Sequence, residues 1–81
     1  MDRHALHAAL RAAGVASGHY WIQGVHEPSP PPTDFLYLRP SPTSPGAWEV
    51  GAYERGTWET ITQHARETDA CTHLLRLLTP A

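Results

Sequence analysis

The pattern of hydrophobic and polar residues predicts a helix near each end of the chain. The first helix is expected over residues 3–13, between Asp2, a good N-cap residue, and Gly14, a residue that favours a helix C-terminus. Its apolar positions recur every three or four residues, at Leu6, Ala9, Leu10 and Ala13. The second helix is expected over residues 67–78, where acidic or capping residues precede the apolar positions Ala70, Leu74, Leu77 and Leu78.

Between the two helices, four segments alternate in hydrophobicity or are rich in aromatic and β-branched residues, as strands are. The predicted strands cover residues 20–23, 34–39, 48–53 and 57–63. Proline-rich segments on either side of the second strand, 26–33 and 40–46, can be neither helix nor central strand. The segment 54–56 ends in a glycine and predicts a tight turn that joins the third and fourth strands into a hairpin.

This order of elements predicts an α+β fold in a single domain over residues 1–81. Because the connections between them are short, the four strands are expected to form an antiparallel meander. The N-terminal and C-terminal helices would then cover one face of the sheet and make a two-layer sandwich.

Composition and charge narrow the range of functions. The 81 residues include six arginines, no lysine and eight carboxylates, which gives a formal net charge of −2. The absence of lysine excludes a Walker-A phosphate loop and a Schiff-base lysine, and the acidic balance argues against a nucleic-acid partner. With 41% hydrophobic and 17% charged residues, the chain is apolar enough to fold.

The sequence also indicates a cytoplasmic protein. Its one cysteine, Cys71, cannot form the intramolecular disulfide that small extracellular domains usually need. The first residues lack the apolar segment of a secretory signal. The longest apolar run, residues 35–38, is far shorter than the roughly 20 residues that cross a membrane. We therefore expect neither export nor a membrane partner.

The chemically reactive side chains do not form a recognisable catalytic or metal site. His4 and His7 are spaced to share an ion on the first helix, but no third ligand is near them in the sequence. Cys71 could act as a nucleophile near a helix N-terminus, but a lone cysteine beside an apolar stripe is typical of core packing. Carboxylates on the third and fourth strands could perform acid–base catalysis, but so short a chain has little room for a cleft. We therefore predict no enzyme, no metal site and no cofactor.

The same carboxylates have a second use, which is the recognition of a protein partner. Several aromatic residues lie on the predicted strands, and alternation forces part of them outward: Trp21, Phe35, Tyr37 and Tyr53. One interpretation is an exposed acidic and aromatic sheet face, which suits protein binding. The other is that helices of the same chain cover the aromatic residues. The pattern leaves both interpretations open.

Several short motifs follow one another at characteristic spacing: Leu6-x-x-x-Leu10-x-x-x-Gly14, Tyr20-x-x-x-Gly24, Trp48-Glu49-Val50, Tyr53-Glu54-Arg55-Gly56 and Glu67-x-x-Ala70-Cys71-x-x-Leu74-Leu75. In their order and spacing, over nearly the whole chain, they resemble the small α+β immunity proteins of bacterial polymorphic toxin systems. The resemblance is to short members typical of high-GC actinobacteria.

This resemblance implies an inhibitor in the cytosol that binds a secreted toxin of the same or a sibling cell and blocks its active site, without catalysis of its own. The cognate toxin would contact the third and fourth strands at Glu49, Tyr53, Glu54, Trp58 and Glu59. Mild acidity agrees with this role, because an acidic surface can fill the basic cleft of an enzyme that acts on nucleic acids or nucleotides.

Two other classes of function stay open. One is a metal-dependent accessory protein that uses histidines, with His64 and His73 as candidates. The other is a homo-oligomeric module, such as a homodimer, whose aromatic face pairs with itself.

Overall fold

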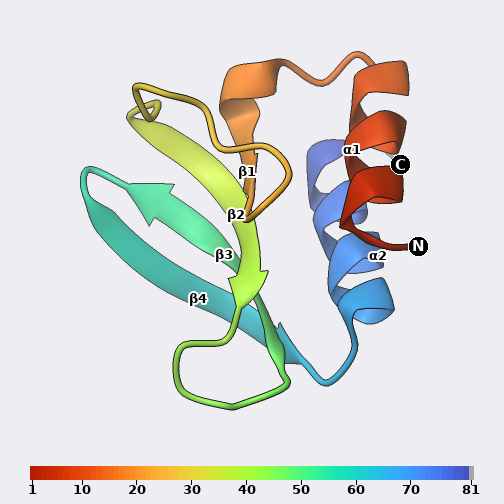
Figure 1. The fold of residues 1–81 in the computed structure, drawn as a ribbon. Coiled ribbons are helices and arrows are strands. Elements are labelled where there is room, and N and C mark those ends of the chain that lie inside the picture. Colours follow the sequence, from red (N-terminus) through yellow and green to blue (C-terminus); the bar gives the residue numbers. More distant parts are fainter. Residues whose placement is uncertain (81) are drawn as a thin grey trace.

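A four-stranded sheet with two helices packed on one of its faces makes up the structure, a computed structural model that describes residues 1–80 (Figure 1). The elements, in chain order, are α1 (Arg3–Ala12), the short 3-10 helix η1 (Ser17–His19), β1 (Tyr20–Ile22), β2 (Asp34–Pro40), β3 (Trp48–Glu54), β4 (Thr57–His64) and α2 (Glu67–Leu78). This arrangement confirms the α+β class, the two terminal helices and the four strands.

The direction of β1 corrects the prediction of a purely antiparallel meander. The sheet order is β1-β2-β3-β4, and β3 pairs antiparallel with both neighbours, but β1 runs parallel to β2, with Tyr20 opposite Leu36. The cause is the path of residues 23–33. The chain first turns back on itself, with an isolated bridge between Ile22 and His26. The proline-rich segment then returns it to the start of β1, so that β2 enters in the same direction.

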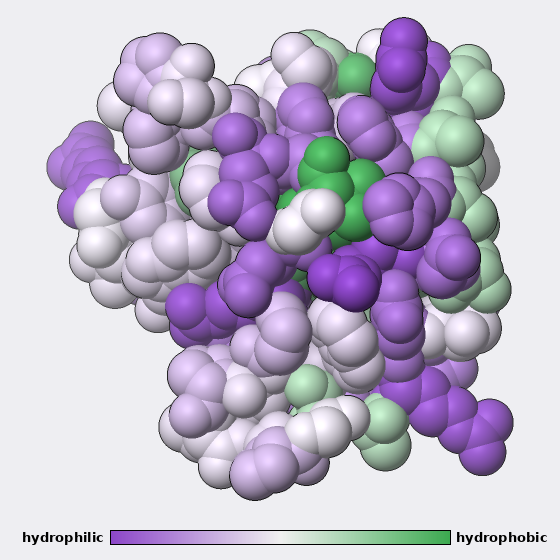
Figure 2. Space-filling view, in the orientation of Figure 1, coloured by the Kyte–Doolittle hydropathy of each residue, from purple (hydrophilic) through white to green (hydrophobic). Residues whose placement is uncertain are grey.

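The hydrophobic core lies between the helices and the sheet. Alternate strand residues and one stripe of each helix are fully buried in it: Leu6, Leu10, Tyr20, Ile22, Leu38, Val50, Ala70, Cys71 and Leu74. On the side drawn in Figure 1, the surface is mostly hydrophilic or intermediate, with a small hydrophobic area near the centre of the view (Figure 2). Helical and strand periodicity therefore converge on one interior, as a two-layer fold requires.

Arg3 ties the two helices to the loop after β1. Its backbone N–H and its Nε both donate to Glu67 Oε2, at 2.9 and 3.1 Å, and its Nη1 donates to the carbonyl oxygen of Gln23 at 2.9 Å. Its guanidinium lies 5.0 Å from the centre of the Trp48 ring. These contacts fix α1 and α2 over the sheet.

The hairpin of β3 and β4 extends away from the helix layer (Figure 1). Its turn has positive φ at both Arg55 (51°) and Gly56 (85°), the combination that suits the twist of a two-residue hairpin turn. The pairing shifts between Val50 and Gly51, so that Ile61 on β4 has no partner in the register. The shift and the absence of helix cover leave six of the eight β4 residues exposed.

Candidate functional site

A cluster of aromatic rings covers the face of the sheet that the helices leave free. It contains Trp21, Phe35, Tyr37, Tyr53 and Trp58, and we call it the aromatic cluster. Phe35 stacks on Tyr53 with ring centres 4.6 Å apart, and Trp58 meets Tyr37 and Tyr53 edge-on at 4.7 and 5.0 Å. Phe35 and Tyr37 are buried, whereas Trp58 is 39% exposed. The helices therefore do not cover these residues; the aromatic residues cover one another, with Trp58 outermost.

Glu49 is buried beneath this cluster. It is 2% exposed, and its Oε2 accepts hydrogen bonds from the Tyr37 hydroxyl at 2.6 Å and from Arg39 Nε at 3.0 Å. The Thr60 hydroxyl donates to its Oε1 at 3.0 Å. Burial acts to raise the pKa of Glu49, but the hydrogen bonds from Tyr37, Arg39 and Thr60 outweigh burial and lower the pKa below its ordinary value. Glu49 is thus an internal anchor and does not face a partner.

Arg39 connects this buried carboxylate to the exposed tryptophan. Its Nη2 lies 2.9 Å from Glu49 Oε2, and its guanidinium lies 4.5 Å from the centre of the Trp58 ring. The Trp58 ring therefore packs against a cation whose own position is fixed by Glu49.

Tyr37, the other buried partner of Glu49, keeps its hydroxyl proton. Burial, with the hydrogen bond to Glu49, raises the pKa of Tyr37 to about 12.

The other four predicted contact residues divide between the two faces of the sheet. Tyr53 and Trp58 pair with each other on the aromatic face. Glu59 pairs with Ala52, and Glu54 lies two residues after Ala52 on the same strand, so both glutamates are on the helix-facing side, beyond the end of the helices. The interpretation of one acidic and aromatic face is therefore wrong. Neighbouring residues of a strand point to opposite faces, and this signal was already present in the sequence pairs Tyr53-Glu54 and Trp58-Glu59.

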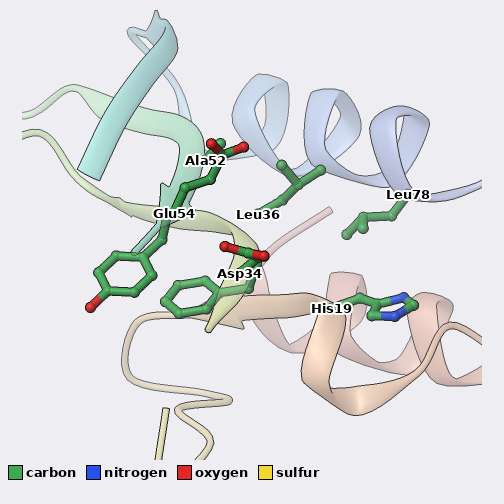
Figure 3. Close-up of a pocket in the computed structure, with 8 residues that line it drawn as sticks. His19, Asp34, Leu36, Ala52, Glu54 and Leu78 are labelled. Atoms are coloured by element: carbon green, nitrogen blue, oxygen red, sulfur yellow. The ribbon is translucent and has the colours of Figure 1, made fainter. Parts of the chain in front are cut away.

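On the helix-facing side, the open end of the sandwich forms a pocket of about 270 Å³ that we call the acid-rimmed pocket. The lining residues are His19, Asp34, Phe35, Leu36, Ala52, Tyr53, Glu54 and Leu78. Asp34 and Glu54 lie directly opposite each other on β2 and β3. Leu78 of α2 and His19 of η1 complete the lining on the other side of the opening (Figure 3). Sequence reasoning missed Asp34, His19 and Leu78, because only the tertiary packing of α2 and η1 brings them to these strands.

The two histidines considered as metal ligands do meet. His64 Nε2 and His73 Nδ1 are 3.0 Å apart, in hydrogen-bond contact between β4 and α2, and Asp69 lines the same surface pocket. In the described part of the chain, no three His, Cys, Asp or Glu side chains converge as a metal site would require. The pair therefore joins the end of the sheet to α2 by a hydrogen bond.

Because of this pair, we expect the protein to be less stable at about pH 5 than at pH 7. Burial lowers the pKa of His73, and the positive charges of His64 and Arg76 lower it further. The unfolded chain then takes up a proton more readily than the folded one. Stability that is present above the unfolded pKa of about 6.5 is lost as the pH falls toward the folded value. Urea unfolding at the two pH values measures this loss.

The matched variants for this experiment are His73→Gln and His4→Gln. The first should reduce the difference in stability between the two pH values, whereas the second changes an exposed residue of α1 and should leave it intact. An unchanged pH dependence in His73→Gln would contradict the prediction.

Cys71 lies in the core rather than at a reactive position. It is fully buried, and burial, with the negative charge of Glu67, raises the pKa of its thiol to about 11. The thiol is therefore protonated at neutral pH and packs as a small apolar side chain.

No helix within residues 1–80 is long and apolar enough to cross a membrane. No protein-family model matches the chain, and searches of curated proteins and of solved structures found no similar protein.

Proposed function

We propose that this protein is a cytoplasmic immunity protein that binds a cognate toxin domain and blocks its active site. The observation that carries the proposal is the acid-rimmed pocket. Asp34 and Glu54 are cross-strand neighbours and lie on the same side of the sheet at the open end of the sandwich. The ion pairs within residues 1–80 engage Glu67 and Glu49 instead, so neither rim carboxylate has a cationic partner there.

The surroundings of the pocket suit a protein partner. On the other face of the same hairpin, Trp58 presents an exposed aromatic ring held in place by Arg39. A fixed aromatic side chain loses little conformational freedom on binding, which favours affinity. Glu59 adds a further exposed carboxylate to this end of the molecule. Aromatic and acidic groups near one projecting hairpin can together enter and neutralise a basic cleft.

The size of the molecule is compatible with such an inhibitor. A typical protein–protein interface buries roughly 800 Å² on each partner, about one sixth of this protein's accessible surface of 4832 Å². One end of the molecule, including the hairpin and the pocket mouth, would therefore suffice.

The test is co-purification of the tagged protein with the product of the adjacent upstream gene, together with rescue of cells that express that product. We expect a 1:1 complex and rescue. Glu54→Arg should weaken binding at least about tenfold, which corresponds to about 1.4 kcal/mol, and Tyr53→Ala should also weaken it. Asp69→Arg, an equal charge change at an exposed position on α2, is the control and should bind as the wild type does. Failure of the folded wild type to bind or protect would reject this neighbour as the toxin.

A second candidate function, self-association, is favoured by the free edge of β4. Most of this eight-residue strand is exposed, and Ile61 on it is 48% exposed. An open edge strand can pair with the same strand of a second copy. Sedimentation at several protein concentrations distinguishes the candidates: a dimer that persists on dilution and is abolished by Ile61→Arg would support self-association.

A further inference from the structure

We propose that the acid-rimmed pocket receives the side chain of a single arginine from the partner protein. This assignment deepens the proposed function and rests on it for the identity of the partner.

The negative charge of the rim favours the binding of a cation. Asp34 and Glu54 are direct cross-strand neighbours, and like charges in that position repel each other. Arg55 follows Glu54, but its side chain is exposed and, within residues 1–80, it forms no ion pair. A cation from a partner would relieve the repulsion and could donate hydrogen bonds to both carboxylates.

The floor selects a cation with an apolar stem. Leu36 and Ala52 from the sheet and Leu78 from α2 line the pocket beneath the carboxylates (Figure 3). Arginine and lysine can both lay their methylene groups on such a surface while the charged end reaches the rim. A metal ion has no apolar part to contact this floor, so an organic cation matches the pocket better.

The choice of arginine over lysine follows from the arrangement of the acceptors. Two carboxylates on adjacent strands offer several oxygens, and the planar guanidinium has five donors in a fixed fork that can address both groups. It is also more weakly hydrated than an ammonium group and loses less on entering a partly apolar pocket.

The volume favours one side chain. At about 270 Å³, the pocket lies just below the range of about 300–1,000 Å³ that is usual for small-molecule sites. It is open to solvent at the end of the sandwich, where a side chain projecting from a flat or convex partner can enter it.

The test uses this protein alone, with N-acetyl-arginine amide as the probe and backbone amide NMR as the measurement. We expect saturable shifts at the amides of Asp34, Leu36 and Glu54, with a dissociation constant of about 1–10 mM, as is reasonable for so small a ligand. N-acetyl-citrulline amide, which has the same shape but no charge, and N-acetyl-lysine amide should each bind at least about fivefold more weakly.

The double variant Asp34→Asn, Glu54→Gln should lose at least tenfold in affinity for the arginine probe. It removes a like-charge pair, so its fold should persist, and circular dichroism checks this. Asp69→Asn removes an exposed carboxylate of α2 outside this pocket lining and is the matched control, with unchanged affinity expected.

The outcomes separate the two proposals. No saturable shifts in the folded protein, equal binding of citrulline, or equal binding of lysine would each overturn the arginine assignment. A toxin complex that forms without arginine binding would leave the inhibitor function standing. If the pocket binds arginine but no toxin complex forms, the arginine assignment stands and the chosen partner is wrong.

Discussion

Replacing Glu49 with alanine is expected to lower the free energy of unfolding by about 3 kcal/mol at pH 7. Glu49 is almost fully buried and accepts hydrogen bonds from Tyr37, Arg39 and Thr60. Alanine would leave the buried Tyr37 hydroxyl without its acceptor and the Arg39 guanidinium without its counter-charge. A domain of this size is stable by only roughly 4–12 kcal/mol, so this loss is a large part of the total. Because each kcal/mol shifts the melting temperature of so small a domain by about 4–8 °C, we expect it to fall by about 12–24 °C. Urea unfolding followed by tryptophan fluorescence provides the measurement.

Glu59→Ala is the control for this experiment. Glu59 is an exposed glutamate on the adjacent strand, and its replacement should change stability by no more than about 0.5 kcal/mol. A loss below about 1 kcal/mol in Glu49→Ala would show that the buried network contributes little.

Acid should reduce the difference between the wild type and Glu49→Gln. The hydrogen bonds to Glu49 hold its pKa below the ordinary value of 4.5, despite the opposing effect of burial. A carboxyl whose pKa is depressed by folding adds stability above its unfolded pKa, and this stability is lost as the pH falls through the folded value. The wild type and the variant should therefore approach each other in stability between about pH 5 and about pH 3.

The buried network bears on the proposed binding function through Trp58. Glu49 fixes Arg39, and Arg39 lies under the exposed Trp58 ring. A partner that contacts Trp58 would meet a side chain already held in its bound position, which reduces the entropy lost on association. Glu49 was predicted as a contact residue. In the structure its role in binding could only be indirect, through the position of that ring.

Local periodicity was sufficient to predict the two α-helices and the four strands. The apolar spacing of Leu6 and Leu10 and the acidic start at Glu67 place both helices within about a residue of their observed bounds. The prolines around β2 correctly predicted loops on both sides of it. These features depend on residues close in the sequence, so no knowledge of packing was needed.

The remaining features depend on contacts between distant segments. The parallel direction of β1 follows from the route of residues 23–33, which no local pattern encodes. The acid-rimmed pocket needs Leu78 of α2 near Asp34 of β2, two residues that are far apart in the sequence. Glu49 is predicted from the sequence to contact a partner, and the aromatic cluster that instead buries it depends on rings brought together from several strands.

Gly51→Ala should be strongly destabilising, with an expected loss of about 3 kcal/mol or more. Gly51 lies opposite Tyr37 in the sheet, and the Tyr37 ring packs against its backbone. A Cβ at this position would overlap the Tyr37 side chain and the carbonyl oxygen of Glu59. Neither can move away easily, because Tyr37 is fully buried and bonded to Glu49, and the Glu59 carbonyl is part of the β4 backbone. Equilibrium unfolding in urea measures the loss.

Gly18→Ala provides the matched control, since a Cβ there would meet only the Pro32 ring at an ordinary contact distance of 3.8 Å. Its stability should remain within about 0.5 kcal/mol of the wild type. A double-mutant cycle then tests the cause. If the Tyr37 ring is responsible, the cost of Gly51→Ala should be smaller in a Tyr37→Leu background, although the overlap with the Glu59 carbonyl would keep part of it. If Gly51→Ala costs the same stability in both backgrounds, the requirement for glycine comes from the β4 backbone alone. If it costs almost nothing in the wild-type background, the hairpin can shift to accept a side chain between its strands and the aromatic cluster.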